Sequence, residues 1–362
     1  MKLIDNLKQN FEALKPESFL NKTHKLKNRK NYHLAKGNDD KVSKYDEKLT
    51  EVISNSKALD ALTLENKLTQ KAKLEEVLVA NENDLEAKRN IEVINDFEDF
   101  NNDENSHLKI SNLSMHFGGL KAVDNLNIEV KKGEIYGLIG PNGAGKTTVF
   151  NCITQFYKPT FGDVFFRDSD NTVHSLINYK THNVIKVGLA RTFQNIELIW
   201  ELNILDNMLV GGQSLYTSGF FTQLLHLPKL NFEDKMLKAK AIKILEELGI
   251  AEYMYSYPMG LPYGILKKIE LARTLMTNPS LIILDEPAAG LNDTETVELA
   301  KFIREIRNKY NLTIFLVEHD MGLVMDVCDR ICAISFGKKL AVGTPEEIQS
   351  NPLVKEAYLG GE

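Results

Sequence analysis

The residues best suited to chemistry form a glycine-rich stretch, GPNGAGKT, at positions 140–147. This stretch satisfies the pattern G-x-x-x-x-G-K-[ST], and a β-like run precedes it while a helical run follows it. Glycines are needed there because a backbone that wraps around a phosphate visits conformations closed to residues with a Cβ. Lys146 supplies a mobile positive charge for the β- and γ-phosphates, and the Thr147 hydroxyl can ligate Mg²⁺. The pattern predicts a phosphate-binding loop of a nucleotide hydrolase.

A pair of adjacent carboxylates ends the apolar run LIILDE at 281–286. Asp285 suits the coordination sphere of Mg²⁺, because this ion prefers oxygen ligands and keeps several waters. Glu286 is the natural residue to polarise an attacking water. Taken alone, the pair would only indicate a strand that ends in solvent. With a phosphate-binding loop upstream, it indicates the second half of a hydrolytic site.

Two more polar residues stand where apolar runs end. His319 closes TIFLVEHD, and Gln194 follows in GLARTFQN. A lone histidine or glutamine at a strand end is usually structural, so the meaning of these two depends on their order along the chain.

The elements that must position these residues alternate from residue 107 onward. Short β-like runs are separated by helical periods and glycine turns, and LIILD and TIFLVE are continuously apolar, as central strands covered on both faces are. Such alternation predicts an α/β domain with a mostly parallel sheet. The hairpin-rich first fifty residues of this segment predict an antiparallel β layer, and the length leaves room for a helical subdomain.

Composition narrows the possible partners and compartments. The 362 residues carry 44 basic and 50 acidic side chains, a net charge of −6, which argues against a dedicated nucleic-acid binder. Three cysteines are too few for a disulfide framework and indicate a reducing compartment, with Cys328 and Cys332 as reduced core residues. We expect neither a membrane span nor a secretory signal.

Residues 1–106 differ from the rest, since Gly37 and Pro16 are their only glycine and proline. Leucines give an approximate helical stripe across 57–80, whereas 21–41 is polar and predicted to be poorly ordered. The acidic, asparagine-rich 95–106 is interpreted as a linker. We therefore expect a polar, weakly helical or disordered extension, with a helical hairpin that docks on a partner as the alternative.

The chain from 107 to 362 resembles the ATP-binding subunit of an ABC transporter. Phe117 lies 23 residues before the loop, Gln194 lies 54 after Gly140, and LIILDEP, AAGLN (288–292) and His319 follow in the family's order. Phrases such as FGGLKAVDN, RTFQNIEL and GTPEEIQSNP resemble one branch, the branched-chain amino acid importer ATPases. The fold implied is a P-loop NTPase with a RecA-like core, an antiparallel β layer and a helical subdomain at about 195–275.

The resemblance also implies roles for individual residues. Phe117 would stack on the adenine, His319 would contact the γ-phosphate, and Glu286 would activate water, with Gln194 and Lys146 completing the catalytic set. Mg²⁺ would be arranged by Thr147, Gln194 and Asp285. The backbone that would hold the phosphates of ATP is that of Asn142, Gly143, Ala144, Gly145, Lys146, Thr147 and Thr148.

The sequence departs from the family at its signature, which is commonly L-S-G-G-Q. The corresponding residues here are Leu261, Pro262, Tyr263, Gly264 and Ile265. They lack the serine hydroxyl and the glutamine amide, and Pro262 has no backbone N–H. In the family's head-to-tail dimer the signature contacts the partner's ATP, so we expect a heterodimer in which a second ATPase subunit provides the better signature.

The resemblance further implies two integral membrane permease subunits and, through them, a periplasmic or extracellular binding protein. The chain would then lie on the cytoplasmic face of the cell membrane. Two alternatives stay open at this point. One is an ABC ATPase for another cargo, such as urea, other amino acids or lipopolysaccharide. The other is a non-transport ABC ATPase, although such proteins carry two motif sets or long coiled coils that this chain lacks.

Overall fold

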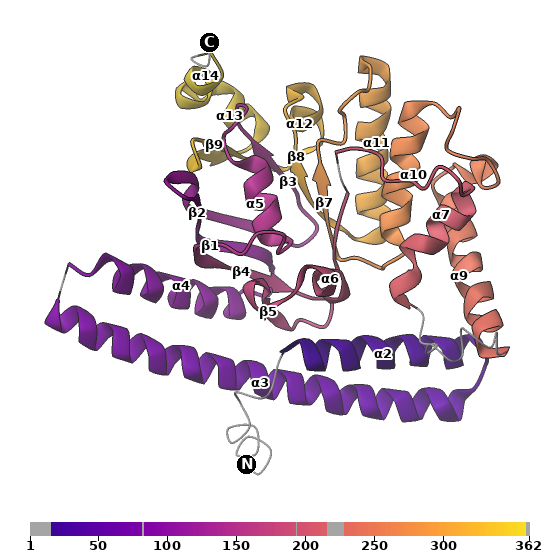
Figure 1. Ribbon diagram of the computed structural model, residues 1–362, viewed down its shortest axis with the longest axis horizontal. Helices are drawn as coiled ribbons and strands as arrows, with labels where there is room; N and C mark the ends of the chain where they lie inside the picture. Colours follow the sequence, from indigo (N-terminus) through magenta and orange to yellow (C-terminus); the bar gives the residue numbers. More distant parts are fainter. Residues whose placement is uncertain (1–15, 82, 193, 216–227, 360–362) are drawn as a thin grey trace.

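Two β-sheets form the centre of the molecule in the computed structural model (Figure 1). The structure describes residues 16–81, 83–192, 194–215 and 228–359, and every statement below concerns these. The six-stranded sheet has the order β10-β9-β3-β8-β7-β6 and the four-stranded sheet the order β2-β1-β4-β5. The strands are β1 (Ser106–Phe117), β2 (Leu120–Lys131), β3 (Ile135–Ile139), β4 (Phe161–Arg167), β5 (Val173–Ser175), β6 (Leu189–Arg191), β7 (Leu281–Asp285), β8 (Thr313–Val317), β9 (Arg330–Ser335) and β10 (Lys338–Gly343).

The six-stranded sheet is parallel except for β10, which pairs antiparallel with β9. Every residue of β3, β7 and β8 is buried, as expected for apolar strands with both faces covered. The prediction of an α/β fold with a mostly parallel sheet is confirmed. Helices of this part are α5 (Lys146–Ile153), α6 (Thr181–Val184), α11 (Asp293–Tyr310), α12 (Met321–Val327), α13 (Pro345–Ser350) and α14 (Pro352–Leu359), with 3₁₀ turns η2 (Leu176–Asn178) and η3 (Ile185–Val187).

The predicted antiparallel β layer is also present. β1 pairs with β2 on one side and with β4 on the other, both antiparallel. A shared core joins this layer to the parallel sheet, and it contains Leu108, Val164, Tyr136 and Phe315. The two sheets are therefore one packed unit, which fixes the loops between them.

A group of helices covers one side of the parallel sheet (Figure 1). Their buried side chains, among them Met208, Leu237, Leu245 and Ile269, belong to the same apolar cluster as the sheet residues Ile282 and Leu316. The elements of this helical subdomain are α7 (Ile204–Gly211), η4 (Gln213–Leu215), α9 (Pro228–Glu247), η5 (Ala251–Tyr253) and α10 (Tyr263–Leu275).

Three helices form the N-terminal part, and here two interpretations from the sequence are wrong. The stretch 21–41 is not poorly ordered but lies mostly in α2 (Pro16–Ala35) and the start of α3 (Asp39–Ala80). The stretch 95–106 is not a linker, because α4 (Leu85–Asn102) occupies 95–102 and buries Phe97 and Phe100. These helices have too few apolar residues for a core of their own. They fold against apolar surface that other parts of the chain supply, and local composition does not reveal such contacts.

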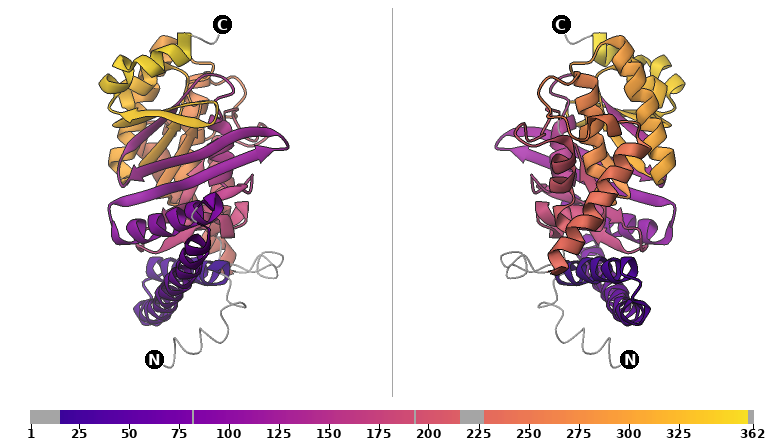
Figure 2. Two further views of the ribbon diagram at one scale, coloured as in Figure 1. Left: turned by 90° about the vertical axis from the view of Figure 1, so that its left-hand side faces the viewer. Right: turned by 90° about the vertical axis from the view of Figure 1, so that its right-hand side faces the viewer.

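The surface that receives α4 belongs to β4. Phe165 is fully buried, with ring centroids 5.2 Å from Phe97 and 6.1 Å from Phe100. The guanidinium of Arg167 donates hydrogen bonds to the backbone carbonyls of Phe100, Asn101 and Asp103. α4 therefore packs on the four-stranded sheet, and α3 and α2 lie below it, at the lower side of the views in Figure 1 and Figure 2. The helical hairpin docks on its own chain.

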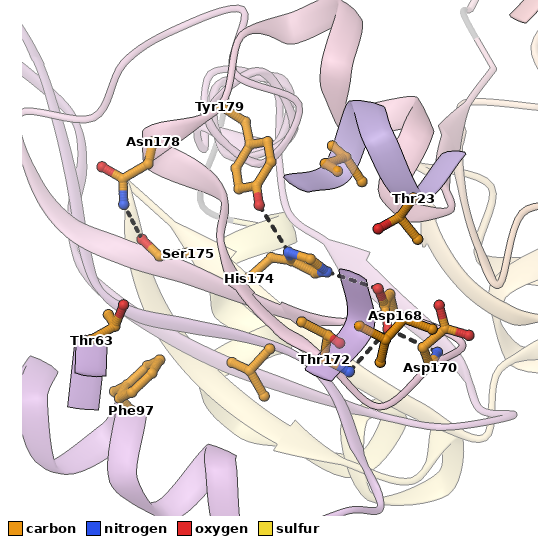
Figure 3. Close-up of a pocket in the computed structure, with 13 residues that line it drawn as sticks. Thr23, Thr63, Phe97, Asp168, Asp170, Thr172, His174, Ser175, Asn178 and Tyr179 are labelled. Atoms are coloured by element: carbon orange, nitrogen blue, oxygen red, sulfur yellow. Dashed lines mark hydrogen bonds and ion pairs between the residues drawn. The ribbon is translucent and has the colours of Figure 1, made fainter. Parts of the chain in front are cut away.

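A small pocket of about 70 Å³ lies between these helices and the β4–β5 hairpin (Figure 3). Several of its polar side chains are bonded to one another. His174 bonds through Nε2 to Asp168 Oδ2 and through Nδ1 to the Tyr179 hydroxyl, both at 2.9 Å. Asn178 donates to Ser175 at 3.0 Å. These bonds lie within the segment 168–179, which forms one wall of the pocket, and α2, α3 and α4 supply the opposite wall.

None of the helices that the structure describes is long and apolar enough to cross a membrane.

Candidate nucleotide site

The phosphate loop, residues 140–147, connects the buried strand β3 to α5. A Cβ at Gly140 would lie 2.3 Å from the carbonyl oxygen of Ile334, and one at Gly145 would lie 2.5 Å from that of Ala122. Gly143 and Gly145 have φ of 79° and 101°, in the left-handed region that favours glycine. The motif needs these glycines because a side chain at Gly140 or Gly145 would clash with a backbone carbonyl, and because Gly143 and Gly145 have positive φ.

The loop presents its backbone amides at the start of α5. The N–H groups of Lys146, Thr147 and Thr148 stand in the first turn, where a helix offers no carbonyl partner. Asn142, Gly143 and Thr147 are exposed. The amide of Ala144 is bonded at 3.1 Å to the carbonyl of Pro141, so this amide is engaged within the loop. The available amides and the positive end of the helix together form an anion-binding site.

Lys146 is buried and folded over the loop. Its Nζ donates to the carbonyl oxygens of Gly140 at 2.6 Å and Pro141 at 3.2 Å. Burial lowers the pKa of the Lys146 ammonium, while Glu286, Asp285 and Glu318 act in the opposite direction. The lysine therefore sits between its own loop and a group of carboxylates.

Three of the predicted site residues, Gln194, Glu286 and His319, lie together. Gln194 donates from Nε2 to Glu286 Oε2 at 2.6 Å, and His319 Nδ1 lies 3.7 Å from the same oxygen. Glu286 adopts a φ of 46°, unusual for a residue with a side chain. Its N–H is held by the carbonyl of Val317 at 2.9 Å. The end of β7 thus aims the Glu286 carboxylate at Gln194 and His319.

Asp285 is held by a residue that the sequence reasoning missed. Arg191, at the end of β6, donates from Nη2 to Asp285 Oδ2 at 2.6 Å, and both side chains are 8% exposed. Arg191 also donates to Asn151 and Thr154, which ties α5 to the same ion pair. Asp285 Oδ1 has no hydrogen-bond partner among the described residues. One feature of the sequence could have pointed to Arg191. It lies three residues before Gln194, at the end of a parallel strand.

Glu318 is a second residue that the sequence did not single out. It is fully buried and accepts hydrogen bonds from the backbone amides of Ala288, His319 and Asp320, at 2.7–3.2 Å. Burial raises the pKa of the Glu318 carboxyl, and the three backbone bonds oppose this shift. Glu318 therefore positions His319 relative to the 288–292 segment. The only local sign of this role in the sequence is that an acidic residue directly precedes a histidine at the end of a strand.

The predicted adenine-stacking residue stands apart from this cluster. Phe117 ends β1, is 43% exposed, and meets Tyr157 edge-to-face with centroids 5.3 Å apart. An exposed aromatic face of this kind can receive a flat heterocycle.

The predicted signature residues lie at the start of α10, in the helical subdomain. Pro262 is the N-cap of the helix, and Tyr263 and Gly264 form its first turn. The ring of Tyr263 packs beside Gly290, where a Cβ would lie 3.2 Å away. One turn further, Lys267 donates to the carbonyl oxygen of Gln194 at 2.6 Å. The signature helix is thus joined to the segments that carry Gln194 and Gly290. Leu261 and Ile265 pack as partly buried residues against the subdomain core.

Comparison with known proteins identifies the family. The sequence model described as "ABC transporter" matches residues 123–289, and that described as "Branched-chain amino acid ATP-binding cassette transporter" matches 338–362. The High-affinity branched-chain amino acid transport ATP-binding protein LivG of Escherichia coli (strain K12) is 45% identical over 253 residues, covering 70% of this chain and 97% of the relative. The chain belongs to the ABC transporter ATPase family.

Further relatives agree. The ATP-binding protein BraF of Pseudomonas aeruginosa is 42% identical, and the probable LivG of Archaeoglobus fulgidus is 35% identical over 257 residues, covering 96% of that protein. Among solved structures, the ADP conformation of an ATP-binding cassette of an ABC transporter matches with a TM-score of 0.61 at 31% identity, over 71% of this chain and 99% of that one. A nucleotide-free cassette from an ABC transporter matches with a TM-score of 0.60.

These findings establish the nucleotide chemistry of this ABC ATPase, which binds and hydrolyses ATP in the service of transport. The two matched segments lie within 123–362 and do not reach the three N-terminal helices. Nothing in the comparisons therefore assigns a role to α2, α3 or α4.

Proposed function

We propose that this chain is the ATP-hydrolysing subunit of an importer for branched-chain amino acids. The observation that carries the proposal is the match to LivG and BraF, proteins named for branched-chain amino acid transport, over 97% of the length of LivG. The second family match, at 338–362, carries the same substrate class in its description. The assembled cluster of Lys146, Gln194, Glu286 and His319 supplies the hydrolytic machinery.

The geometry supports a division of labour among the site residues. The amides of the phosphate loop and Lys146 neutralise the phosphates, and phosphoryl transfer needs such positioning more than covalent chemistry. Glu286 orients and polarises the attacking water. Gln194 and His319, which both face one Glu286 oxygen, hold that carboxylate and reach the terminal phosphate. Phe117 stacks on the adenine.

The residues around Asp285 fit a magnesium ion. Mg²⁺ is usually bound by one or two carboxylates together with substrate phosphates, rather than by an all-protein cage. The described residues contain no group of three or more His, Cys, Asp or Glu side chains suited to a metal, which agrees with that mode. Asp285 Oδ1, Thr147 and Gln194 would hold the ion, which supplies charge neutralisation to the phosphates of ATP.

The subunit would dock on permease partners through its helical subdomain. Hydrogen bonds from Ile204 to Ser256 and from Leu205 to Met254 join the start of α7 to the 254–256 segment. Large apolar side chains are exposed in and around these segments, namely Ile199 (39%), Trp200 (44%), Tyr255 (69%), Tyr257 (56%) and Met259 (77%). Exposed apolar groups of this kind mark protein interaction sites. Two permease subunits would then hold the chain at the cytoplasmic face, with a binding protein on the other side.

The degenerate signature supports a heterodimer. Pro262 provides no N–H at the N-terminus of α10, and neither Pro262 nor Ile265 offers a polar side chain. In a head-to-tail dimer the weaker contacts would fall on the partner's ATP, so a second ATPase subunit with a complete signature would complete the site built on Lys146.

Uptake in the source organism tests the proposal. Deleting the gene should abolish high-affinity uptake of radiolabelled leucine, isoleucine and valine, and leave urea uptake unchanged. Wild-type protein should restore uptake, whereas Glu286→Gln should not. Integral membrane subunits should co-purify with both proteins. Normal leucine uptake in the deletion strain, with loss of another cargo, would refute the assignment of substrate.

A further inference from the structure

A hollow of about 180 Å³ separates α2 from α9, outside the nucleotide site. From α2 it is lined by Asn28, Asn31 and Tyr32, and from α9 by Glu233, Met236, Leu237 and Lys240, with Leu215 and Asn278 completing the lining. The α2 residues are spaced i, i+3, i+4, and the α9 residues i, i+3, i+4, i+7. Each set therefore forms one helix face, and the two faces look at each other across the hollow.

The edge of the hollow is held by aromatic and polar contacts. The Tyr32 ring meets Phe232 of α9 edge-to-face with centroids 5.0 Å apart, and Lys36 lies 4.7 Å from the Phe232 centroid. Asn28 donates to the carbonyl of Ser214 at 3.4 Å. These contacts fix α2 against the helical subdomain, so the hollow has a defined frame.

Lys240 places an incompletely compensated cation at the wall of this hollow. Its Nζ donates to two neutral oxygens, the Met276 carbonyl at 2.5 Å and Asn278 Oδ1 at 2.8 Å. No carboxylate among the described residues pairs with it, and burial lowers the pKa of the Lys240 ammonium to about 8. An ammonium has three donors, so one remains for an acceptor. Burying a cation is costly unless an anion accompanies it.

The rest of the lining is suited to an apolar tail with few polar groups. Leu215, Met236 and Leu237 supply aliphatic surface, and the Asn31 amide can both donate and accept. Glu233, 5% exposed, lies on the same face of α9, seven residues and about 10 Å before Lys240. The hollow thus offers a cation at Lys240 and apolar surface beside it.

We propose that this hollow binds a small aliphatic carboxylate, with the carboxylate on Lys240 and the apolar tail against Met236 and Leu237. An α-amino acid and its 2-oxo analogue share this chemistry. The ligand would bridge α2 and α9, so the site exists only because the N-terminal helices are present. The inference does not depend on the transported cargo or on the hydrolytic roles proposed above.

Calorimetric titration of the purified full-length chain tests the proposal, with L-leucine in one arm and 4-methyl-2-oxopentanoate in the other. We expect at least one of them to bind with a 1:1 stoichiometry and to raise the melting temperature. Lys240→Met, which keeps the aliphatic stem and removes the charge, should weaken binding about tenfold or more. Lys243→Met is the matched control, because Lys243 lies on the same helix and is 73% exposed. It should leave affinity within about twofold.

The outcomes of the titration distinguish the two ligands and test the proposed site. Tighter binding of leucine identifies an amino-acid site, tighter binding of the oxo acid identifies a site for 2-oxo acids, and both support the carboxylate site. If Lys240→Met does not fold, Met236→Trp, which fills the hollow, should abolish binding while ATP hydrolysis continues. The proposal fails if neither compound binds at about 10 mM, or if Lys240→Met or Met236→Trp binds as tightly as the wild type.

Discussion

Glu286 combines an unusual backbone conformation with two polar neighbours on one carboxylate oxygen, and this argues that its position is adjusted for chemistry. We predict that Glu286→Gln lowers ATP turnover by about 10²- to 10⁴-fold, because an amide of the same shape cannot accept a proton. Nucleotide affinity should stay within about threefold, since the phosphate loop is unchanged. Steady-state hydrolysis and binding of a fluorescent ATP analogue provide the measurements.

Glu298→Gln, on the exposed side of α11, serves as the control for this variant and should hydrolyse ATP normally. Undiminished turnover in Glu286→Gln would contradict the role given to the carboxylate.

At the residue scale, the sequence predicted the members of the hydrolytic cluster better than their supports. Gln194, Glu286 and His319 were identified by type and order along the chain, and the structure places them together. Arg191 and Glu318 were not, because their importance comes from contacts across neighbouring strands and from complete burial. A carboxylate that accepts three backbone amides cannot be distinguished in a sequence from one that faces solvent.

At the scale of elements, the contact between α3 and β4 contains a buried carboxyl whose titration affects stability. Asp163 accepts a hydrogen bond from Ser175 and lies 3.9 Å from Lys67 Nζ, and burial raises the pKa of its carboxyl to about 6. Between pH 4 and 6 the folded chain therefore holds a proton that the unfolded chain has released. Stability must fall as pH rises through this window, by up to about 3 kcal/mol.

We predict that Asp163→Asn removes this pH dependence, because an amide does not titrate. Urea unfolding of both proteins at pH 4.5 and 7 provides the measurement. Asp170→Asn, in a half-buried pair with Lys27, is the control and should retain the wild-type slope. An identical slope in Asp163→Asn would show that another group causes it.

The elements themselves were predictable to the extent that their pattern is local. Continuous apolar runs revealed β7 and β8, and the glycine loop revealed the β3–α5 connection. The helix α4 was missed, since Phe97 and Phe100 share their core with Phe165 and Val173, more than sixty residues away. A contact between residues so far apart in the sequence produces no hydrophobic periodicity in a polar segment.

At the scale of the whole molecule, the weak signature predicts dependence on a partner. The chain alone should hydrolyse ATP slowly, and addition of a second ATPase subunit with a complete signature should raise turnover at least about tenfold. The double variant Pro262→Ser/Ile265→Gln should raise the turnover of the isolated chain in the same direction, because each copy would then supply the missing donors to its neighbour. Hydrolysis measured against protein concentration provides the test. Fast turnover of the isolated wild-type chain would refute the need for a partner.

The burial of Phe165 by Phe97 and Phe100 has a practical consequence for anyone who wishes to shorten this protein. The region shared with relatives contains one half of that contact, and the helices that precede it contain the other. A fragment cut to the size of its relatives would present β4 with a bare aromatic face and leave Arg167 without its three carbonyl acceptors. The limit of sequence similarity to the family therefore divides one packed contact, and we expect a fragment cut there to unfold at a lower urea concentration than the full chain.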